Sequence, residues 1–326
     1  MGVGKPQAVV VTGGLGYVGQ SLAAALIQQS DHVVIALDTR DIPSQVPNVL
    51  AIHGSIGEER HWDDIFSRFD VHTIYHCAGR IVVSESVRHP SEYFHDNVVE
   101  GYKMLDTLQR HGVWVPIVFS SSAAVYGYPD RIPIDENAPK NPTSPYGVSK
   151  WQFEQALAAY EKAYGQPWAA LRYFNVAGML HGVKEQHVPE THLLPLVAQA
   201  LARGEEPTIF GEDYPTVDGT AVRDYIHMKD LVAAHLQAAQ YLHSGGTSDA
   251  FNLGSGRGYS VKEVIAGFQK MLHHAVTFRV GPRREGDPAA LVADIHKAQD
   301  ALNFSPVHSR SLDEMIQDIW GQAFSS

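Results

Sequence analysis

The sequence predicts an α/β fold organised around a doubly wound, parallel β-sheet. Apolar, β-branched segments of strand length alternate with segments of helix length through the first half of the chain, an alternation typical of βαβ units. A glycine-rich turn joins the first apolar segment to the first helical one. The 326 residues, of which 44% are hydrophobic and 19% charged, suffice for a large core in one domain or in two closely associated domains.

The composition argues against several classes of protein. No apolar run approaches the roughly 18 residues of a membrane span, and the N-terminus lacks the basic region and the cleavage site of a signal peptide. Cys77 is the single cysteine, so an internal disulfide is impossible and we expect a cytoplasmic protein. The formal charge of −11 argues against nucleic acid or an anionic membrane as the main partner. The 18 histidines show no metal-ligand spacing, so we expect no metal site.

The N-terminal segment has the pattern of a dinucleotide-binding βαβ unit. In order, it comprises a strand at 8–12, a turn containing Gly13, Gly16 and Gly19, a helix at 21–29, a strand at 32–37 and Asp38. The glycines let the backbone approach a pyrophosphate at the helix N-terminus, where amide groups and the helix dipole favour anions. Asp38, 19 residues after Gly19, would bind the adenosine ribose and repel a 2′-phosphate. The pattern therefore predicts a Rossmann-type sheet that prefers NAD to NADP.

The later elements continue the alternation as far as Asn175. The predicted strands are 49–52, 73–76, 116–120 and 168–174, and the predicted helices are 58–69, 90–111 and 146–164. Because ligands bind outside the carboxyl ends of parallel strands, we expect the glycine turn, residues 77–80 and residues 120–122 to share one edge of the sheet. Beyond Asn175 we predict helices at 193–202, 230–242 and 261–272 and a strand at 251–253, with loop at 176–189 and a polar, turn-rich stretch at 210–224.

Tyr146 and Lys150 stand four residues apart where a helix is expected to begin near Pro145. This spacing puts the phenol and the ammonium one turn apart on the same helix face. A neighbouring ammonium stabilises a phenolate and lowers a pKa that is otherwise about 10, so that the tyrosine can accept a proton near neutral pH. An ordinary helix start with a surface lysine has the same spacing, and the interpretation depends on the surrounding motifs.

Longer motifs resemble one family over nearly the whole chain, from about Val9 to about Phe304. The glycine turn, the serine strand and the Tyr146-x-x-x-Lys150 pair resemble the extended short-chain dehydrogenase/reductase superfamily. Five stretches narrow the resemblance to the UDP-glucose (UDP-galactose) 4-epimerase family: 78–86, 119–127, 171–178, 210–227 and 283–287. The resemblance implies an isomerase with NAD as cofactor, which interconverts UDP-galactose and UDP-glucose through a transient 4-keto sugar.

The resemblance also implies roles for individual residues. Tyr146 would take the proton from the sugar 4-hydroxyl, Ser122 would hydrogen-bond the same hydroxyl, and Lys150 would bind the nicotinamide ribose. The residues implied for the cofactor are Gly13, Gly16, Tyr17, Val18, Gly19, Asp38, Ile56, Ala78, Gly79, Asn97, Ser120, Tyr146, Lys150 and Phe174. Those implied for the UDP-hexose are Ser122, Tyr146, Asn175, Leu193, Phe210, Arg223, Arg284 and Asp287. Two arginines suit a diphosphate because they form forked, charge-assisted hydrogen bonds.

Two domains and a homodimer are further implications of the resemblance. Residues 1–175 with about 225–253 would form the NAD-binding domain, and about 176–224 with 254–326 a smaller α/β domain that binds the UDP-sugar. By family analogy, the helices at 92–109 and 151–164 would form the dimer interface.

Departures from the family pattern leave the substrate range and the cofactor affinity open. Ile81 replaces a lysine that contacts the cofactor, with Arg80 beside it as a substitute, and Ser55 replaces an aspartate that contacts adenine. The residue that limits the sugar 2-substituent falls near Leu291, so related UDP-N-acetylhexosamine or UDP-uronate 4-epimerases remain alternatives.

Two other functions on the same scaffold are disfavoured by particular residues. A nucleotide-sugar 4,6-dehydratase would need an acid pair directly after Ser122, where Ala123 and Ala124 stand. A dinucleotide-sensing regulator would typically lack Tyr146 or Lys150, and both are present.

Overall fold

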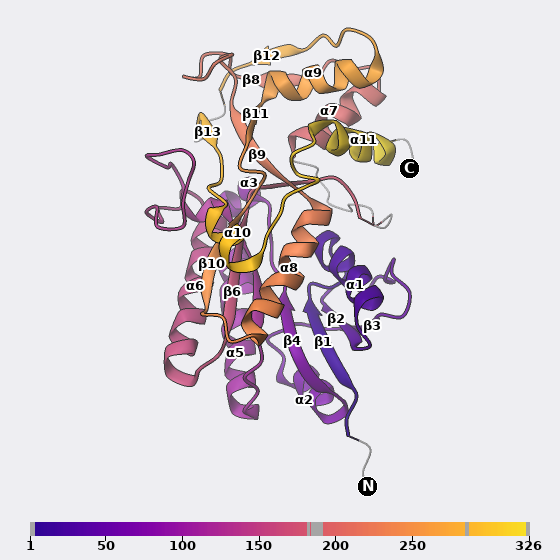
Figure 1. Cartoon of the computed structure of the whole chain (residues 1–326), viewed down its shortest axis with the longest axis vertical. Helices are drawn as coiled ribbons and strands as arrows, with labels where there is room; N and C mark the ends of the chain where they lie inside the picture. The colour runs from indigo at the N-terminus through magenta and orange to yellow at the C-terminus, as the bar shows by residue number, and fades with distance from the viewer. Residues whose placement is uncertain (1–3, 181–182, 184–191, 284–286, 324–326) are drawn as a thin grey trace. The chain divides into compact units, whose positions relative to one another are not determined.

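The computed structural model describes residues 4–180, 183, 192–283 and 287–323 (Figure 1). The chain divides into two compact units, each assembled from three separate stretches. Unit 1 consists of Met1–Gly127, Lys140–Arg172 and Val232–Phe251, and unit 2 of Tyr128–Pro139, Tyr173–Leu231 and Asn252–Ser326.

A seven-stranded sheet forms the centre of unit 1. Its spatial order is β3 (Leu50–His53), β2 (Val33–Asp38), β1 (Gln7–Thr12), β4 (Asp70–His76), β5 (Ile117–Ser122), β6 (Trp168–Tyr173) and β10 (Asp249–Leu253). The pairs β1–β2, β1–β4, β2–β3 and β4–β5 are parallel. This order, which begins 3-2-1-4-5-6, is that of a doubly wound Rossmann sheet, and the predicted fold class is confirmed.

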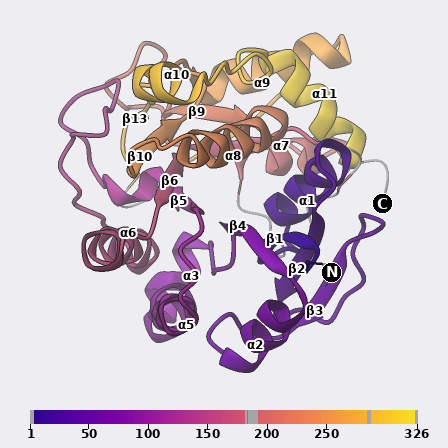
Figure 2. The same ribbon diagram turned by 60° about the horizontal axis from the view of Figure 1, so that its bottom comes forward.

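Helices cover both faces of this sheet (Figure 2). α2 (Glu59–Arg68), α5 (Glu100–His111) and α6 (Pro145–Tyr164) lie on one face, and α1 (Tyr17–Gln29) and α8 (Met228–His243) on the other. Alternate residues of β1, Ala8 and Val10, join the core formed with the helices of the first face. Val9 and Val11 on the opposite face are equally buried, which explains why the strand reads as a continuous apolar run.

The stretch predicted as one helix at 90–111 is interrupted. It comprises α4 (Pro90–Phe94), a π-helical turn (His95–Val99) and α5, and a short helix α3 (Val83–Arg88) precedes it. The sequence does not reveal the interruption, because the π turn is itself helical and continues directly from α4 into α5. Single π turns inside α-helices occur frequently at functional sites, and this one contains Asn97.

Unit 2 contains smaller sheets and a helical layer. β9 (Val222–His227) pairs with β11 (Gly258–Ser260), β13 (Ala290–Leu291) and β7 (Asn175–Ala177), and β8 (Thr208–Phe210) pairs with β12 (Arg279–Gly281). The helices are α7 (Leu193–Ala202), α9 (Val261–Leu272), α10 (His296–Leu302) and α11 (Leu312–Ala323). The core of this unit includes Leu194, Phe268 and Ile316, one from each of α7, α9 and α11.

The differences from the sequence prediction concentrate in unit 2. Helices α7 and α9 have the predicted bounds, but β7 and β9 overlap the stretches 176–189 and 210–224, which were predicted as loop and as polar and turn-rich. Polar residues at the start of β9, Arg223 and Asp224, conceal its strand pattern. Within the described ranges, no helix combines the length and the apolar character needed to cross a bilayer.

Candidate active site

The glycine turn between β1 and α1 is packed too closely for side chains. Gly13 has a φ of +64°, and a Cβ there would lie 2.7 Å from Cα of Ala78, just beyond β4. A Cβ on Gly19 would lie 2.3 Å from the Gly13 carbonyl oxygen. The turn therefore brings the end of β1, the start of α1 and residue 78 together, and it leaves backbone amides at the helix start where an anion would bind.

Asp38 ends β2 beside this turn. Its carboxylate accepts hydrogen bonds from Leu15 N at 2.9 Å and from Arg40 N at 2.9 Å, and Arg40 adds an ion pair at 2.9 Å. Burial acts to raise the pKa of Asp38, but the contacts with Arg40 and Leu15 outweigh it and the pKa lies below the usual value. The sequence interpretation did not identify Arg40. An arginine just past the acid is the position at which NADP-binding proteins accommodate the 2′-phosphate, and that spacing was the available signal.

Asn97 fixes the segment that follows β4. Its Oδ1 accepts from Arg80 N at 2.7 Å, and its Nδ2 donates to Arg80 O at 3.0 Å and to Ser149 Oγ at 2.9 Å. Gly79 has a φ of +143°, and a Cβ there would lie 2.8 Å from Asn97 Oδ1 and 3.5 Å from Lys150 Nζ. The predicted cofactor residues Gly79, Asn97 and Lys150 are thus adjacent.

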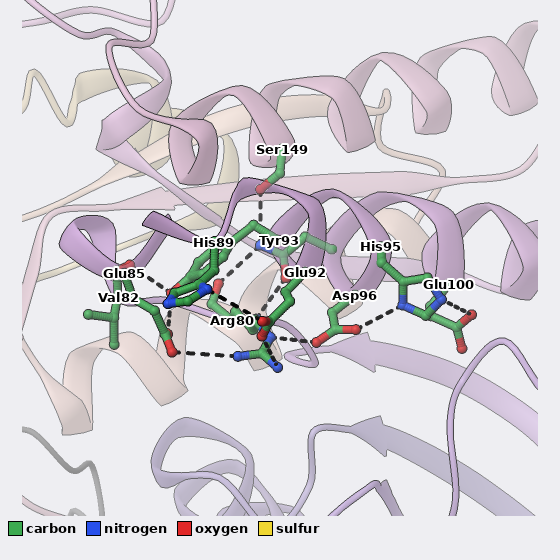
Figure 3. Close-up of polar contacts among 11 residues, drawn as sticks. Arg80, Val82, Glu85, His89, Glu92, Tyr93, His95, Asp96, Glu100 and Ser149 are labelled. Atoms are coloured by element: carbon green, nitrogen blue, oxygen red, sulfur yellow. Dashed lines mark hydrogen bonds and ion pairs between the residues drawn. The ribbon is translucent and has the colours of Figure 1, made fainter. Parts of the chain in front are cut away.

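The Arg80 side chain is bound by acidic residues of α3, α4 and the π turn (Figure 3). It forms ion pairs with Asp96 at 2.7 Å, with Glu92 at 2.8 Å and with Glu85 at 3.7 Å. The Asp96 hydrogen bond is the largest influence that raises the pKa of Arg80. Through these ion pairs Arg80 links α3, α4 and the π turn. Ser55, which stands where the family pattern has an aspartate, donates a hydrogen bond to Glu100.

Tyr146 lies in the first turn of α6, at a precisely capped helix start. The Ser144 side chain accepts a hydrogen bond from Gly147 N at 3.2 Å, and Pro145 follows the cap. A Cβ on Gly147 would lie 2.5 Å from the Ala124 carbonyl oxygen, so the helix start packs directly against the turn after β5. Ser122, at the end of β5, lies near enough to the Tyr146 side chain to act on its pKa.

Lys150 lies one turn further along the same face of α6. Its Nζ donates to Ser120 O at 2.9 Å and stands 5.9 Å from the centroid of the Tyr146 ring. Burial lowers the pKa of Lys150 to about 8, while Cys77 and Glu154 act in the opposite direction. Burial raises the pKa of Tyr146, and the nearby Ser122 side chain opposes the rise. The ammonium alone therefore does not produce the predicted depression of the Tyr146 pKa.

The predicted substrate residues of unit 2 lie on or beside its strands. Arg223 on β9 forms an ion pair with Asp287, and Asn175 on β7 donates to Asp224 O at 3.0 Å. Phe210 ends β8 and is exposed, Leu193 begins α7, and Phe174 is buried before β7. Arg284 lies outside the described residues. Its neighbour Arg283 stacks over Tyr214, with Cζ 4.2 Å from the ring centroid.

The fold and these side chains agree with comparisons to known proteins. Residues 9–254 match the family described as NAD dependent epimerase/dehydratase. The chain belongs to this family. It is 42% identical over 322 residues to the UDP-glucose 4-epimerase of Corynebacterium glutamicum, with 98% of this chain and 95% of the relative covered.

Solved structures of family members superpose over almost the full length. The UDP-glucose 4-epimerase of Brucella ovis in complex with NAD has a TM-score of 0.91, with 35% identity and 98% of each chain covered. That of Bifidobacterium longum in complex with NAD+ and UDP has a TM-score of 0.85, with 34% identity and 97% of each chain covered. The resemblance to the UDP-glucose 4-epimerase family is therefore confirmed.

The residues of unit 1 fit the dinucleotide that the family name specifies. The glycine turn has no room for side chains and ends at a helix N-terminus, as a pyrophosphate requires. Asp38 at the end of β2 has the charge and the position that suit a ribose diol. Gly79, Asn97 and Lys150 border the next part of the same sheet edge.

Proposed function

We propose that this protein is an NAD-dependent 4-epimerase that interconverts UDP-galactose and UDP-glucose through a transient 4-keto sugar. The observation that carries the proposal is the placement of Ser122 near Tyr146, with Lys150 one helical turn away and bound to Ser120 O, at the carboxyl edge of the parallel sheet. The near full-length similarity to UDP-glucose 4-epimerases supports the choice of substrate.

Within this proposal, unit 1 binds NAD and Tyr146 is the base. Bound NAD+ would supply a hydride acceptor and a positive charge. Because burial raises the pKa of Tyr146, the phenol would need positive charge from the cofactor as well as from Lys150 before it could accept a proton. Ser122 binds the same sugar hydroxyl and passes the proton to Tyr146. After the 4-keto sugar turns over, C4 would regain a hydride on its other face, and the same groups return the proton to the C4 oxygen.

Unit 2 holds the UDP group in this proposal. Arg223 and Arg284 would neutralise the diphosphate, Asp287 would bind the uridine ribose, and Asn175, Leu193 and Phe210 would complete the site. The Arg223–Asp287 ion pair supports this assignment because it orients a guanidinium and a carboxylate side by side. The solved relative that contains NAD+ and UDP provides further support.

The deciding experiment is to incubate the pure protein with UDP-galactose, without added cofactor, and to separate the nucleotide sugars. We expect UDP-glucose to form. Conversion of UDP-N-acetylgalactosamine or a UDP-uronate in place of UDP-galactose would reassign the substrate. No conversion of any UDP-hexose would contradict the proposed function.

A 4,6-dehydratase would form a 4-keto-6-deoxy sugar in the same experiment. Ala123 and Ala124 form the 3-10 turn directly after Ser122, where that reaction needs an acid pair. Their methyl side chains cannot transfer protons, so we do not expect this product.

We further propose a cytoplasmic homodimer in which the helices at 92–109 and 151–164 meet their copies. Val99 and Tyr102 support the first of these because both are exposed apolar side chains in unit 1. Exposed side chains of this kind mark protein–protein contacts when they are adjacent. Sedimentation velocity of the wild-type protein and of Tyr102→Asp tests the proposal: a dimer that becomes monomeric supports it, and a wild-type monomer contradicts it.

A further inference from the structure

Helix α6 contacts the end of β5 on three successive turns. Tyr146 lies near Ser122, and Lys150 donates to Ser120 O at 2.9 Å. One turn later, Glu154 accepts a hydrogen bond from Ser121 Oγ at 2.5 Å. Residues 146, 150 and 154 share one helix face because they are four apart. The pair identified from the sequence is therefore part of a series of three.

Glu154 is a buried charge that unit 1 fully pairs. Its carboxylate forms a bidentate ion pair with Arg172 of β6, with Nη2 to Oε2 at 2.6 Å and Nε to Oε1 at 3.0 Å. Arg172 also donates to Tyr126 OH at 2.9 Å, beyond the 3-10 turn that follows Ser122. Both charged side chains are less than 5% exposed. Such pairs often contribute no more stability than apolar side chains of the same volume, so stability alone does not account for this one.

The position of Glu154 gives it a second partner. Its negative charge acts on Lys150, one turn away, in the direction that keeps the ammonium protonated. The other groups that face Lys150 are Tyr146 on α6, Cys77 and His76 at the end of β4, and the Phe119 ring on β5. Burial holds His76 neutral and raises the pKa of the Cys77 thiol. Among these neighbours, Glu154 supplies the carboxylate charge that acts on Lys150.

We propose that Glu154 is a positioning residue for the 4-epimerase reaction: it fixes the serine end of β5 to the helix that carries Tyr146, and it presents the negative charge that faces the Lys150 ammonium. This inference rests on the proposed function, because Lys150 and Tyr146 take their roles from it. Arg172 and Ser121 hold the Glu154 carboxylate in place.

Glu154→Gln tests the inference because it removes the charge and keeps the shape. Lys150 loses the negative charge that favours its ammonium, and the Arg172 cation is left without its partner. Both changes disfavour the protonated form of Lys150. We expect kcat for UDP-galactose at pH 7 to fall roughly tenfold with KM unchanged. In a plot of kcat against pH, kcat should fall on the alkaline side as Lys150 loses its proton. We expect this alkaline limb to move to lower pH by about one unit in Glu154→Gln. An alkaline limb at the wild-type pH would overturn the proposal.

Two variants separate charge from position. Glu154→Asp keeps the charge but shortens the side chain, so it should restore the alkaline limb while kcat stays low. Ser121→Ala removes the contact with β5 and keeps the ion pair, so it should lower kcat severalfold with the limb unchanged. If both variants behave like wild type, the positioning role is wrong. The matched control is Glu161→Gln, the same change seven residues further along α6, which should leave the limb in place.

A stability measurement tests the Glu154–Lys150 contact without any activity. The cost of Glu154→Gln is largest while Lys150 is protonated and falls when it loses its proton. The gap in unfolding free energy between wild type and Glu154→Gln should therefore narrow from pH 7 to pH 9.5. The gap for Glu161→Gln should stay constant. A constant gap for both would overturn the inference even if UDP-galactose is converted, and a narrowing gap would support it even if the proposed function fails.

Discussion

Asn97 donates a hydrogen bond from Nδ2 to Ser149 Oγ, 2.9 Å away, and thereby joins the π turn to the helix of Tyr146. Ser149 passes the connection on, because its hydroxyl donates to Tyr146 O at 2.7 Å. Asn97 also binds the amide and the carbonyl of Arg80. Two buried side chains therefore connect the segment after β4 with the first turn of α6, so the proposed positions of the cofactor and of Tyr146 as the base depend on each other.

Ser149→Ala should weaken this connection. The variant leaves the Asn97 amide without one of its two acceptors in a buried site, which costs about 1–2 kcal/mol of unfolding free energy. We expect kcat for UDP-galactose to fall severalfold as the first turn of α6 loosens. Urea unfolding and steady-state kinetics measure the two effects. Ser91→Ala, at an exposed serine of α4, is the control that should change neither, and a Ser149→Ala enzyme with wild-type kcat would contradict the coupling.

Tyr146→Phe should separate catalysis from binding. The ring is retained and continues to pack edge-on against Tyr93, with centroids 6.5 Å apart, but the proton acceptor is gone. We expect turnover to fall by at least about a hundredfold. Calorimetric titration should give NAD and UDP affinities within about twofold of wild type. Unchanged turnover would rule out Tyr146 as the base.

The sequence predicted those parts of the fold and site that depend on local pattern. β1 and β2 were readable because both faces are buried, and the Tyr146–Lys150 pair because helical spacing alone puts its members together. The π turn at Asn97 could not be predicted from the sequence, since its residues continue a helical pattern. The arginine contacts were also missed. Arg40 pairs with Asp38 two residues before it, where the spacing was an available signal, whereas Arg80 pairs with Asp96, 16 residues on, only when the chain has folded. The role of Glu154 depends on β6 and β5 lying beside α6, which no local pattern specifies.

Asp38→Asn should weaken the discrimination between NAD and NADP. The amide oxygen can still accept from Leu15 N, but the charge that repels a 2′-phosphate is removed and Arg40 loses its partner. We expect the ratio of NADP to NAD dissociation constants to fall by about tenfold or more, which corresponds to about 1.4 kcal/mol. Binding titrations of the two dinucleotides measure the ratio. Asp41→Asn, an exposed acid three residues on, should leave it unchanged, and an unchanged ratio in Asp38→Asn would exclude Asp38 from cofactor selection.

Asp224→Asn should destabilise unit 2 near Arg223. The carboxylate accepts from Ser255 N at 2.8 Å and Ser255 Oγ at 2.6 Å on one oxygen, and from Ala293 N at 3.0 Å and Gly256 N at 3.2 Å on the other. An asparagine would turn an NH2 group toward one of these sets of donors. We expect a loss of about 2–4 kcal/mol in unfolding free energy.

The same variant should weaken UDP binding, because Asp224 anchors the strand position next to Arg223 to the loop at 255–256 and to residue 293. Isothermal titration with UDP measures this effect, and denaturant unfolding measures the stability. Asp300→Asn is the matched control, since Asp300 is an exposed acid in α10 of the same unit. Stability within about 0.5 kcal/mol of wild type would mean that the four hydrogen bonds of Asp224 do not hold these segments together. A stability loss with unchanged UDP affinity would instead exclude Arg223 from the diphosphate site. If Arg223 bound the diphosphate, the loosening of its strand in Asp224→Asn would weaken UDP binding.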